Sequence, residues 1–205
     1  MPAEQHDEAV SLSELKRKIR ARAETNRHKQ QNKGQLSRTI CERLAGLPKY
    51  AAAETLLIYV DIPPEVQTRH FFPNIRSQNK RLVVPYCCGD ELKLFWLDNI
   101  EELTPRAFGI LEPRDALRDC ASRTVDAAEL DLVAVPGVAF DRSGGRIGHG
   151  RGYFDRLLGR VRSDTHLVGL AFECQLFPNV PMGEHDVYLD KVITEQAVYE
   201  RAKSG

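Results

Sequence analysis

Short apolar runs of strand type alternate with segments of helical character through most of this chain. The runs cover residues 55–60, 81–85, 130–135 and 166–172. Strands this apolar are buried on both faces, as in parallel sheets that are covered by helices. The pattern therefore predicts an α/β fold with three layers, in which a mostly parallel central sheet carries helices on both faces in a Rossmann-like arrangement.

Helices are predicted between these runs, over about 13–29, 35–47, 68–77 and 153–161. Ser11, three residues before Glu14, is typical of a capping box at the start of the first helix. Segment 92–97 alternates after a glycine-containing turn, so we expect it to be the return arm of a hairpin with 81–85. Segment 104–128 has no clear period and is predicted to be mostly loop.

Length and charge suit one intracellular domain. The 205 residues predict a single domain over 1–205, and 29 basic residues balance 29 acidic ones, which argues against a nucleic-acid or membrane partner. No apolar run approaches the roughly 18–20 residues that span a bilayer, and segment 1–18 lacks the apolar stretch of a secretory leader. Five cysteines without CxxC spacing predict free thiols in the cytoplasm. We expect a monomer.

The first predicted helix is strongly basic. Residues 14–33 contain eight basic and two acidic side chains, a local net charge of +6. Lys16, Arg20 and Arg27 fall on one flank of this helix. Such a run is either a solvated helix face or a cationic surface directed at phosphates.

A glycine-rich stretch follows the strand predicted at 130–135. Five of the nine residues from Gly144 to Gly152 are glycine, and Arg142, Arg146 and Arg151 are interleaved with them. Ligands of parallel sheets bind beyond the carboxyl ends of strands, and amides of glycine-rich turns bind anions. The stretch therefore predicts a phosphate-binding loop, with a flexible surface hairpin as the alternative. It matches neither the Walker A nor the GxGxxG pattern.

Two aspartates near this stretch could hold a metal ion. Asp155, just inside the helix predicted at 153–161, could cap free amides or bind Mg²⁺. Asp186, in a later loop, could be a second ligand or a turn former. No histidine pair has the spacing of a zinc motif, so zinc catalysis is not expected.

The stretch from Pro136 to Leu158 resembles the 5-formyltetrahydrofolate cyclo-ligase family. Its matching positions are Pro136, Gly137, Phe140, Asp141, Arg146, Gly148, Gly150, Gly152, Tyr153 and Asp155. Agreement is weaker for the basic first helix, for Glu65 in the segment DIPPEVQT, and for the closing segment HDVYLDKVITE. The resemblance implies an architecture like that of NagB, RpiA and the CoA transferases.

The activity that the resemblance implies is a ligation in one-carbon metabolism. ATP and Mg²⁺ would drive the cyclisation of 5-formyltetrahydrofolate to 5,10-methenyltetrahydrofolate, with release of ADP and phosphate. The γ-phosphoryl group would pass to the formyl oxygen, and the N10 amine would then attack the activated carbon. Positioning and charge neutralisation are the enzyme's main tasks in such a transfer.

The resemblance also assigns residues to roles. ATP would contact Lys16, Arg20, Arg146, Ile147, Gly148, His149, Gly150, Arg151, Gly152, Tyr153 and Phe154. The folate would contact Val60, Glu65, His149, Gly150, Arg151, Gly152 and Tyr153. Arg146, Arg151, Tyr153 and Asp155 would be catalytic, and Asp155 and Asp186 would bind Mg²⁺.

Four positions depart from the family pattern. Leu12 stands where many members have lysine, Lys16 and His149 replace arginines, and Arg151 replaces a lysine. These changes could weaken ATP binding or alter substrate use. Two other functions are alternatives: a phosphosugar- or CoA-handling enzyme of similar architecture, and a nucleic-acid-binding module that uses the basic helix.

Overall fold

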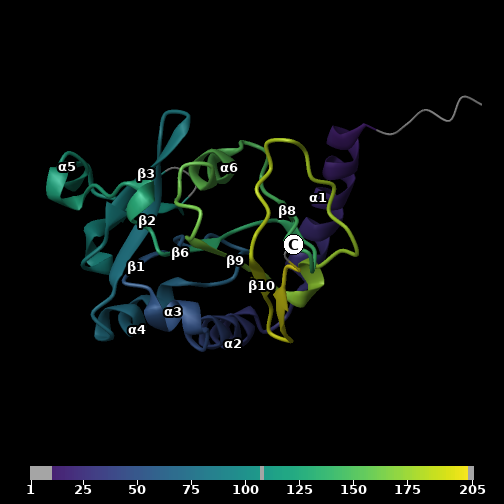
Figure 1. The fold of residues 1–205 in the computed structure, drawn as a ribbon, viewed down its shortest axis with the longest axis horizontal. Helices are drawn as coiled ribbons and strands as arrows, with labels where there is room; N and C mark the ends of the chain where they lie inside the picture. Colours follow the sequence, from purple (N-terminus) through teal and green to yellow (C-terminus); the bar gives the residue numbers. More distant parts are fainter. Residues whose placement is uncertain (1–10, 107–108, 203–205) are drawn as a thin grey trace, which may run out of the picture.

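The computed structural model describes residues 11–106 and 109–202 and has a seven-stranded sheet at its centre (Figure 1). The strand order is β11-β10-β9-β6-β1-β2-β3. Neighbours from β10 to β2 are parallel, and the edge strands β3 and β11 are antiparallel to β2 and β10. The bounds are β1 (Thr55–Leu57), β2 (Arg81–Cys88), β3 (Glu91–Trp96), β6 (Leu132–Val135), β9 (His166–Leu170), β10 (Lys191–Ile193) and β11 (Val198–Glu200).

Helices cover both faces of this sheet, as predicted. They are α1 (Leu12–Lys29), α2 (Lys33–Ala45), α3 (Pro48–Ala52), α4 (Phe72–Ser77), α5 (Asp115–Arg118) and α6 (Tyr153–Leu158). Figure 1 shows α2, α3 and α4 side by side beneath the sheet, with α6 above it. Short 3-10 helices are η1 (Arg69–Phe71), η2 (Ile100–Glu102), η4 (Ala121–Arg123), η5 (Ala127–Glu129) and η6 (Glu173–Gln175). No helix of the described ranges is long and apolar enough to cross a membrane.

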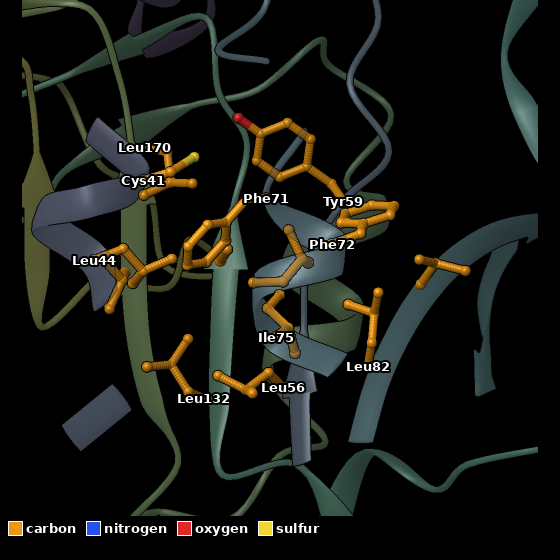
Figure 2. Close-up of a cluster of buried hydrophobic side chains, with 14 of the residues drawn as sticks. Cys41, Leu44, Leu56, Tyr59, Phe71, Phe72, Ile75, Leu82, Leu132 and Leu170 are labelled. Carbon is orange, nitrogen blue, oxygen red and sulfur yellow. The ribbon is translucent and has the colours of Figure 1, made fainter. Parts of the chain in front are cut away.

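Alternation along the strands builds two hydrophobic clusters, one on each face. Leu56 and Leu132 lie in the cluster that also contains Leu44 of α2 (Figure 2), whereas the next residue of β1, Leu57, packs in the cluster with Leu157 of α6. All of these side chains are buried. Burying one such leucine stabilises a fold by about 1.5–3 kcal/mol. Apolar residues on both faces of a strand are therefore favourable, because helices cover both faces of the sheet. The predicted three-layer fold is confirmed.

Several predicted boundaries are wrong in detail. A separate helix, α3, begins at Pro48, where proline is accepted because the first helical residues need no amide donor. The strand predicted at 55–60 ends at Leu57. The predicted loop 104–128 contains part of a small antiparallel pair, β4 (Leu103–Pro105) with β5 (Leu111–Pro113), and the helix α5. Residues 107–108 of that segment, and 1–10 of the segment predicted to lack a leader, lie outside the described residues.

The last strand, β11, is not predicted by the sequence, because three residues are too few to show a hydrophobic period. The predicted helix 153–161 ends at Leu158. All five cysteines have free thiols, as expected, with Cys41 buried and Cys87, Cys88 and Cys120 exposed.

Candidate functional site

A cavity of about 560 Å³ opens beyond the carboxyl ends of β1 and β6. Adjacent parallel strands end at the same edge of a sheet, so the loops after them face one another. All fifteen residues assigned to a site from the sequence line this cavity: Lys16, Arg20, Val60, Glu65, Arg146, Ile147, Gly148, His149, Gly150, Arg151, Gly152, Tyr153, Phe154, Asp155 and Asp186. The structure therefore brings them together, while their individual roles stay predictions.

The first half of the glycine-rich stretch is a hairpin whose strands are buried and whose turn exposes Arg142 and Ser143, so the expectation of a surface hairpin holds for the turn alone. β7 (Ala139–Phe140) pairs with β8 (Arg146–Ile147) in an antiparallel ladder. Asp141 fixes the turn, because its Oδ1 accepts hydrogen bonds of 2.8 Å from the amides of Ser143 and Gly145. Gly144 has φ of +85°, and a Cβ there would collide with the Leu189 carbonyl oxygen.

The second half, residues 148–152, is the part that faces the cavity. We call it the glycine loop. His149, Gly150 and Arg151 are exposed, and Gly150 and Gly152 have φ of +95° and +65°. Positive φ is accessible to glycine at no steric cost, so the backbone can present amides that a side chain would otherwise cover. Because α6 is only six residues long, the loop amides, rather than a helix dipole, are the backbone groups that could interact with an anion here.

Arg146 forms the buried floor beside this loop. Its side chain is 3% exposed, and Nη2 donates to Asp155 Oδ1 in an ion pair. The Nε of Arg146 has no hydrogen-bond partner among the described residues. A buried guanidinium with an unused donor is suited to an anionic ligand, because pairing such a group recovers the free energy lost on burial.

Helix α1 supplies two further cations to the cavity, Lys16 and Arg20. Lys16 Nζ forms an ion pair with Asp186 Oδ2, which also accepts a 2.5 Å hydrogen bond from the Gly183 amide. Burial alone would raise the pKa of Asp186, but these two hydrogen bonds and the charge of Arg146 hold it below its usual value. Arg20 Nε donates to the Gly148 carbonyl at 3.0 Å and so attaches α1 to the glycine loop.

Asp155 and Asp186 both line the cavity, and their carboxylate oxygens are the type of ligand that Mg²⁺ prefers. Each is engaged by its cation through one oxygen only, Oδ1 of Asp155 and Oδ2 of Asp186. No group of three or more metal-ligating side chains occurs in the described part of the chain, so a protein cage is absent there. Mg²⁺ commonly takes one or two carboxylates and completes its shell with water and substrate phosphate, which two aspartates beside a phosphate-type loop can accommodate.

The opposite wall comes from the segment after β1. Glu65 is 9% exposed, and its Oε2 accepts a 3.2 Å hydrogen bond from the Ile62 amide. Asp61 holds this segment, because its Oδ1 accepts from the amides of Thr68 and Arg69 at 2.9 Å. Burial would raise the pKa of Asp61, yet the hydrogen bonds from Arg69 and Thr68 lower it. The segment therefore presents Glu65 on a fixed support.

An apolar part of the wall was missed from the sequence. It comprises Ile62, Pro85, Leu92, Ile110 and Leu111, with Cys87 at its edge. Pro85, Cys87 and Leu92 belong to the β2–β3 hairpin, and the other contributors stand in loops or on the short strand β5. The only signal that could have found Leu92 is its place at the start of an alternating run, which does not reveal which face a ligand uses.

Two arginines that the sequence offered as candidates for phosphate contact, Arg142 and Arg27, do not line the cavity. Arg142 is 68% exposed, pairs with Glu173 and stacks over the Tyr199 ring at 4.8 Å, away from the cavity. Arg27, on the same flank of α1 as Lys16, is buried, and its Nη1 lies 3.5 Å from the Gly137 carbonyl oxygen. The basic flank of α1 is thus partly a cavity wall and partly a support beneath it.

The chain matches one protein family over nearly its full length. The model of the 5-formyltetrahydrofolate cyclo-ligase family matches residues 2–195. The 5-formyltetrahydrofolate cyclo-ligase of Escherichia coli K12 is 31% identical over 176 residues, which cover 83% of this chain and 92% of the relative. The mouse protein of the same name is 27% identical over 194 residues, with 90% and 92% covered.

A solved structure agrees with this match. The NMR structure of 5,10-methenyltetrahydrofolate synthetase from Aquifex aeolicus has a TM-score of 0.78 and 31% sequence identity. The similarity covers 95% of this chain and 94% of that one. Fold and sequence therefore point to the same set of proteins.

Proposed function

The chain belongs to the 5-formyltetrahydrofolate cyclo-ligase family, and on this premise we propose that it converts 5-formyltetrahydrofolate to 5,10-methenyltetrahydrofolate at the expense of ATP, with Mg²⁺ bound. One observation carries the proposal. A single cavity is lined by cationic side chains and the glycine loop, and also by apolar side chains and Glu65. A triphosphate suits the first part, and a fused aromatic ring with polar edges suits the second.

The chemistry explains why a nucleotide is needed. The oxygen of an N-formyl group is a poor leaving group, so the N10 amine cannot displace it directly. In the proposed reaction the γ-phosphoryl group leaves ADP and bonds to the formyl oxygen. The N10 lone pair then attacks the formyl carbon, the carbon–oxygen bond breaks and phosphate departs, while the N10 proton passes to water.

The residues of the chain mainly position and neutralise charge. Arg146 and Arg151 would bind oxygens of the transferring group, and Lys16 and Arg20 would approach the triphosphate from α1. Asp155 and Asp186 would hold Mg²⁺, which when bound neutralises phosphate oxygens. Glu65 and Tyr153 would face the folate, where a carboxylate can accept hydrogen bonds from N–H groups of the ring. Val60, the glycine loop and Phe154 would complete the walls.

A direct assay tests this proposal. Purified protein mixed with 5-formyltetrahydrofolate, ATP and Mg²⁺ should produce the near-ultraviolet absorbance of the methenyl product, and reactions without ATP should not. Absence of an ATP-dependent signal at high enzyme concentration would contradict the proposal. We further propose that the protein acts as a cytoplasmic monomer, which light scattering after size exclusion would check for the oligomeric state.

A further inference from the structure

Arg156, in α6, connects the glycine loop to the β2–β3 hairpin. Its Nη1 donates to the Arg151 carbonyl at 3.1 Å, and its Nη2 donates to the Asp90 carbonyl at 2.5 Å. The guanidinium carbon also lies 5.3 Å from the centre of the Tyr153 ring. One planar group therefore contacts the glycine loop, the hairpin turn and the first residue of α6 at once.

Neighbouring contacts reinforce this connection. The Tyr153 hydroxyl donates to the Gly89 carbonyl at 3.1 Å, so Tyr153 and Arg156 bind successive carbonyls of the same turn. Gly152 has φ of +65°, and a Cβ built on it would lie 3.0 Å from Arg156 Nη1. The guanidinium thus lies close against the backbone that ends the glycine loop.

The connection lies behind the cavity wall. Arg151, Tyr153, Cys87 and Leu92 line the cavity, whereas Arg156 is not among the described residues that do. The carbonyls that it binds belong to the glycine loop and to the two-residue turn that closes the β2–β3 ladder, and no strand pairing among the described residues joins these two segments to each other. A fork with two donors in a fixed plane can set the spacing between two such segments, which a single ammonium cannot do.

We propose that Arg156 is a positioning residue that sets the distance between the glycine loop and the β2–β3 hairpin, and so orients Arg151 and Tyr153 toward the substrates. This inference rests on the proposed function. It assigns Arg156 no contact with ATP or folate. Its effect on catalysis passes through the two wall residues that it supports.

Arg160 offers a matched control on the same side of the molecule. Its Nη1 lies 3.6 Å from Glu91 Oε2, so it also links the region of α6 to the hairpin. Among the described residues it forms no side-chain hydrogen bond or ion pair with the glycine loop. Replacing Arg160 therefore removes a cation and one link to the hairpin, and leaves the connection to Arg151 in place.

Kinetic measurements distinguish a bridging role of Arg156 from an effect of its positive charge alone. Arg156→Gln and Arg156→Lys should both lower kcat/KM for ATP by about five- to thirtyfold, the range for losing one or two good interactions. Arg160→Gln should stay within about twofold of the wild type, as exposed ion pairs contribute little. Wild-type kinetics in Arg156→Lys would show that only the positive charge matters and would overturn the proposal. Equal losses in Arg156→Gln and Arg160→Gln would overturn it as well.

Hydrogen exchange tests the same connection without relying on activity. Amides of residues 89–92 and 150–153 should exchange faster in Arg156→Lys than in the wild type, whereas Arg160→Gln should leave 150–153 unchanged. Unaltered exchange in both segments of Arg156→Lys would refute the bridging role. If the wild-type protein had no cyclisation activity, the proposed function would be refuted instead. The hydrogen-exchange comparison would still test whether Arg156 connects the two segments.

Discussion

His149 Nε2 lies 3.6 Å from Glu65 Oε1, so an imidazole of the glycine loop faces a buried carboxylate of the segment after β1 across the cavity. The family resemblance leads us to expect an arginine at this position. An arginine carries a permanent charge and more hydrogen-bond donors than an imidazole.

His149→Arg should therefore improve ATP binding. We expect the KM for ATP to fall by about three- to tenfold, because a permanent cation strengthens hydrogen bonds to phosphate. His28→Arg, at an exposed site on α1, is the control and should leave the KM for ATP unchanged. An unchanged KM in His149→Arg would contradict a role for residue 149 in ATP binding.

Asp155→Asn should keep the fold and lose most turnover. A neutral amide binds Mg²⁺ poorly, and it also leaves the buried guanidinium of Arg146 without its counter-charge. We expect kcat/KM to fall by at least about 100-fold, the scale on which loss of one transition-state contact is felt. The measurement is the cyclisation rate over a Mg²⁺ titration, with circular dichroism to confirm folding. Unchanged kinetics would contradict the metal role.

Asp186 should contribute to the acid sensitivity of the protein. Because hydrogen bonds from Lys16 and Gly183 lower its pKa in the folded state, its stabilisation is present above the unfolded-state pKa and is lost as pH falls through the folded-state pKa. Asp186→Asn should accordingly flatten the fall in the free energy of unfolding below about pH 5. Denaturant titrations from neutral to acidic pH measure this slope.

Glu184→Gln, at an exposed position of the same loop, is the comparison for that experiment. It should leave the acid slope of the wild type intact. If Asp186→Asn and Glu184→Gln gave the same slope as the wild type, the contacts of Asp186 with Lys16 and Gly183 would contribute nothing to acid stability.

Gly144→Ala should destabilise the fold severely. The new Cβ would meet the Leu189 carbonyl oxygen at a position whose φ is already +85°. We expect a loss of about 3–5 kcal/mol in the free energy of unfolding, typical of overpacking combined with backbone strain. Gly109→Ala, with φ of +74° and no atom of the described residues within 4 Å of the new Cβ, should cost only about 1–2 kcal/mol. Equal losses in urea titrations would mean that the contact with Leu189 is unimportant.

The predictable parts of the site are those whose residues lie close together in the sequence. The glycine loop follows a strand, and its glycines and arginines are adjacent in sequence, so their chemistry could be inferred from residue order alone. Lys16, Glu65 and Asp186 were placed through the family resemblance, since no spacing rule links residues that lie so far apart. Their convergence on one cavity depends on the strand order.

What could not be predicted depends on packing between distant segments. Gly144 looked like part of a phosphate loop, but its freedom from a side chain serves the contact with Leu189. Arg142 looked like a phosphate ligand, but it stacks on Tyr199 of the unanticipated strand β11. The apolar wall came from β5 and the β2–β3 hairpin, whose alternation shows which residues are buried but not which of them meet a ligand.

The strand order also has a consequence for how the molecule is made on the ribosome. Strand β1 emerges early and can pair with β2, which pairs in turn with β3, but the other edge of β1 stays open until β6 has been translated. The glycine loop follows β6, and Asp186 emerges only after β9. A nascent chain can therefore gain no stability from bound substrate until it is nearly finished, and its first half must persist through synthesis without that help.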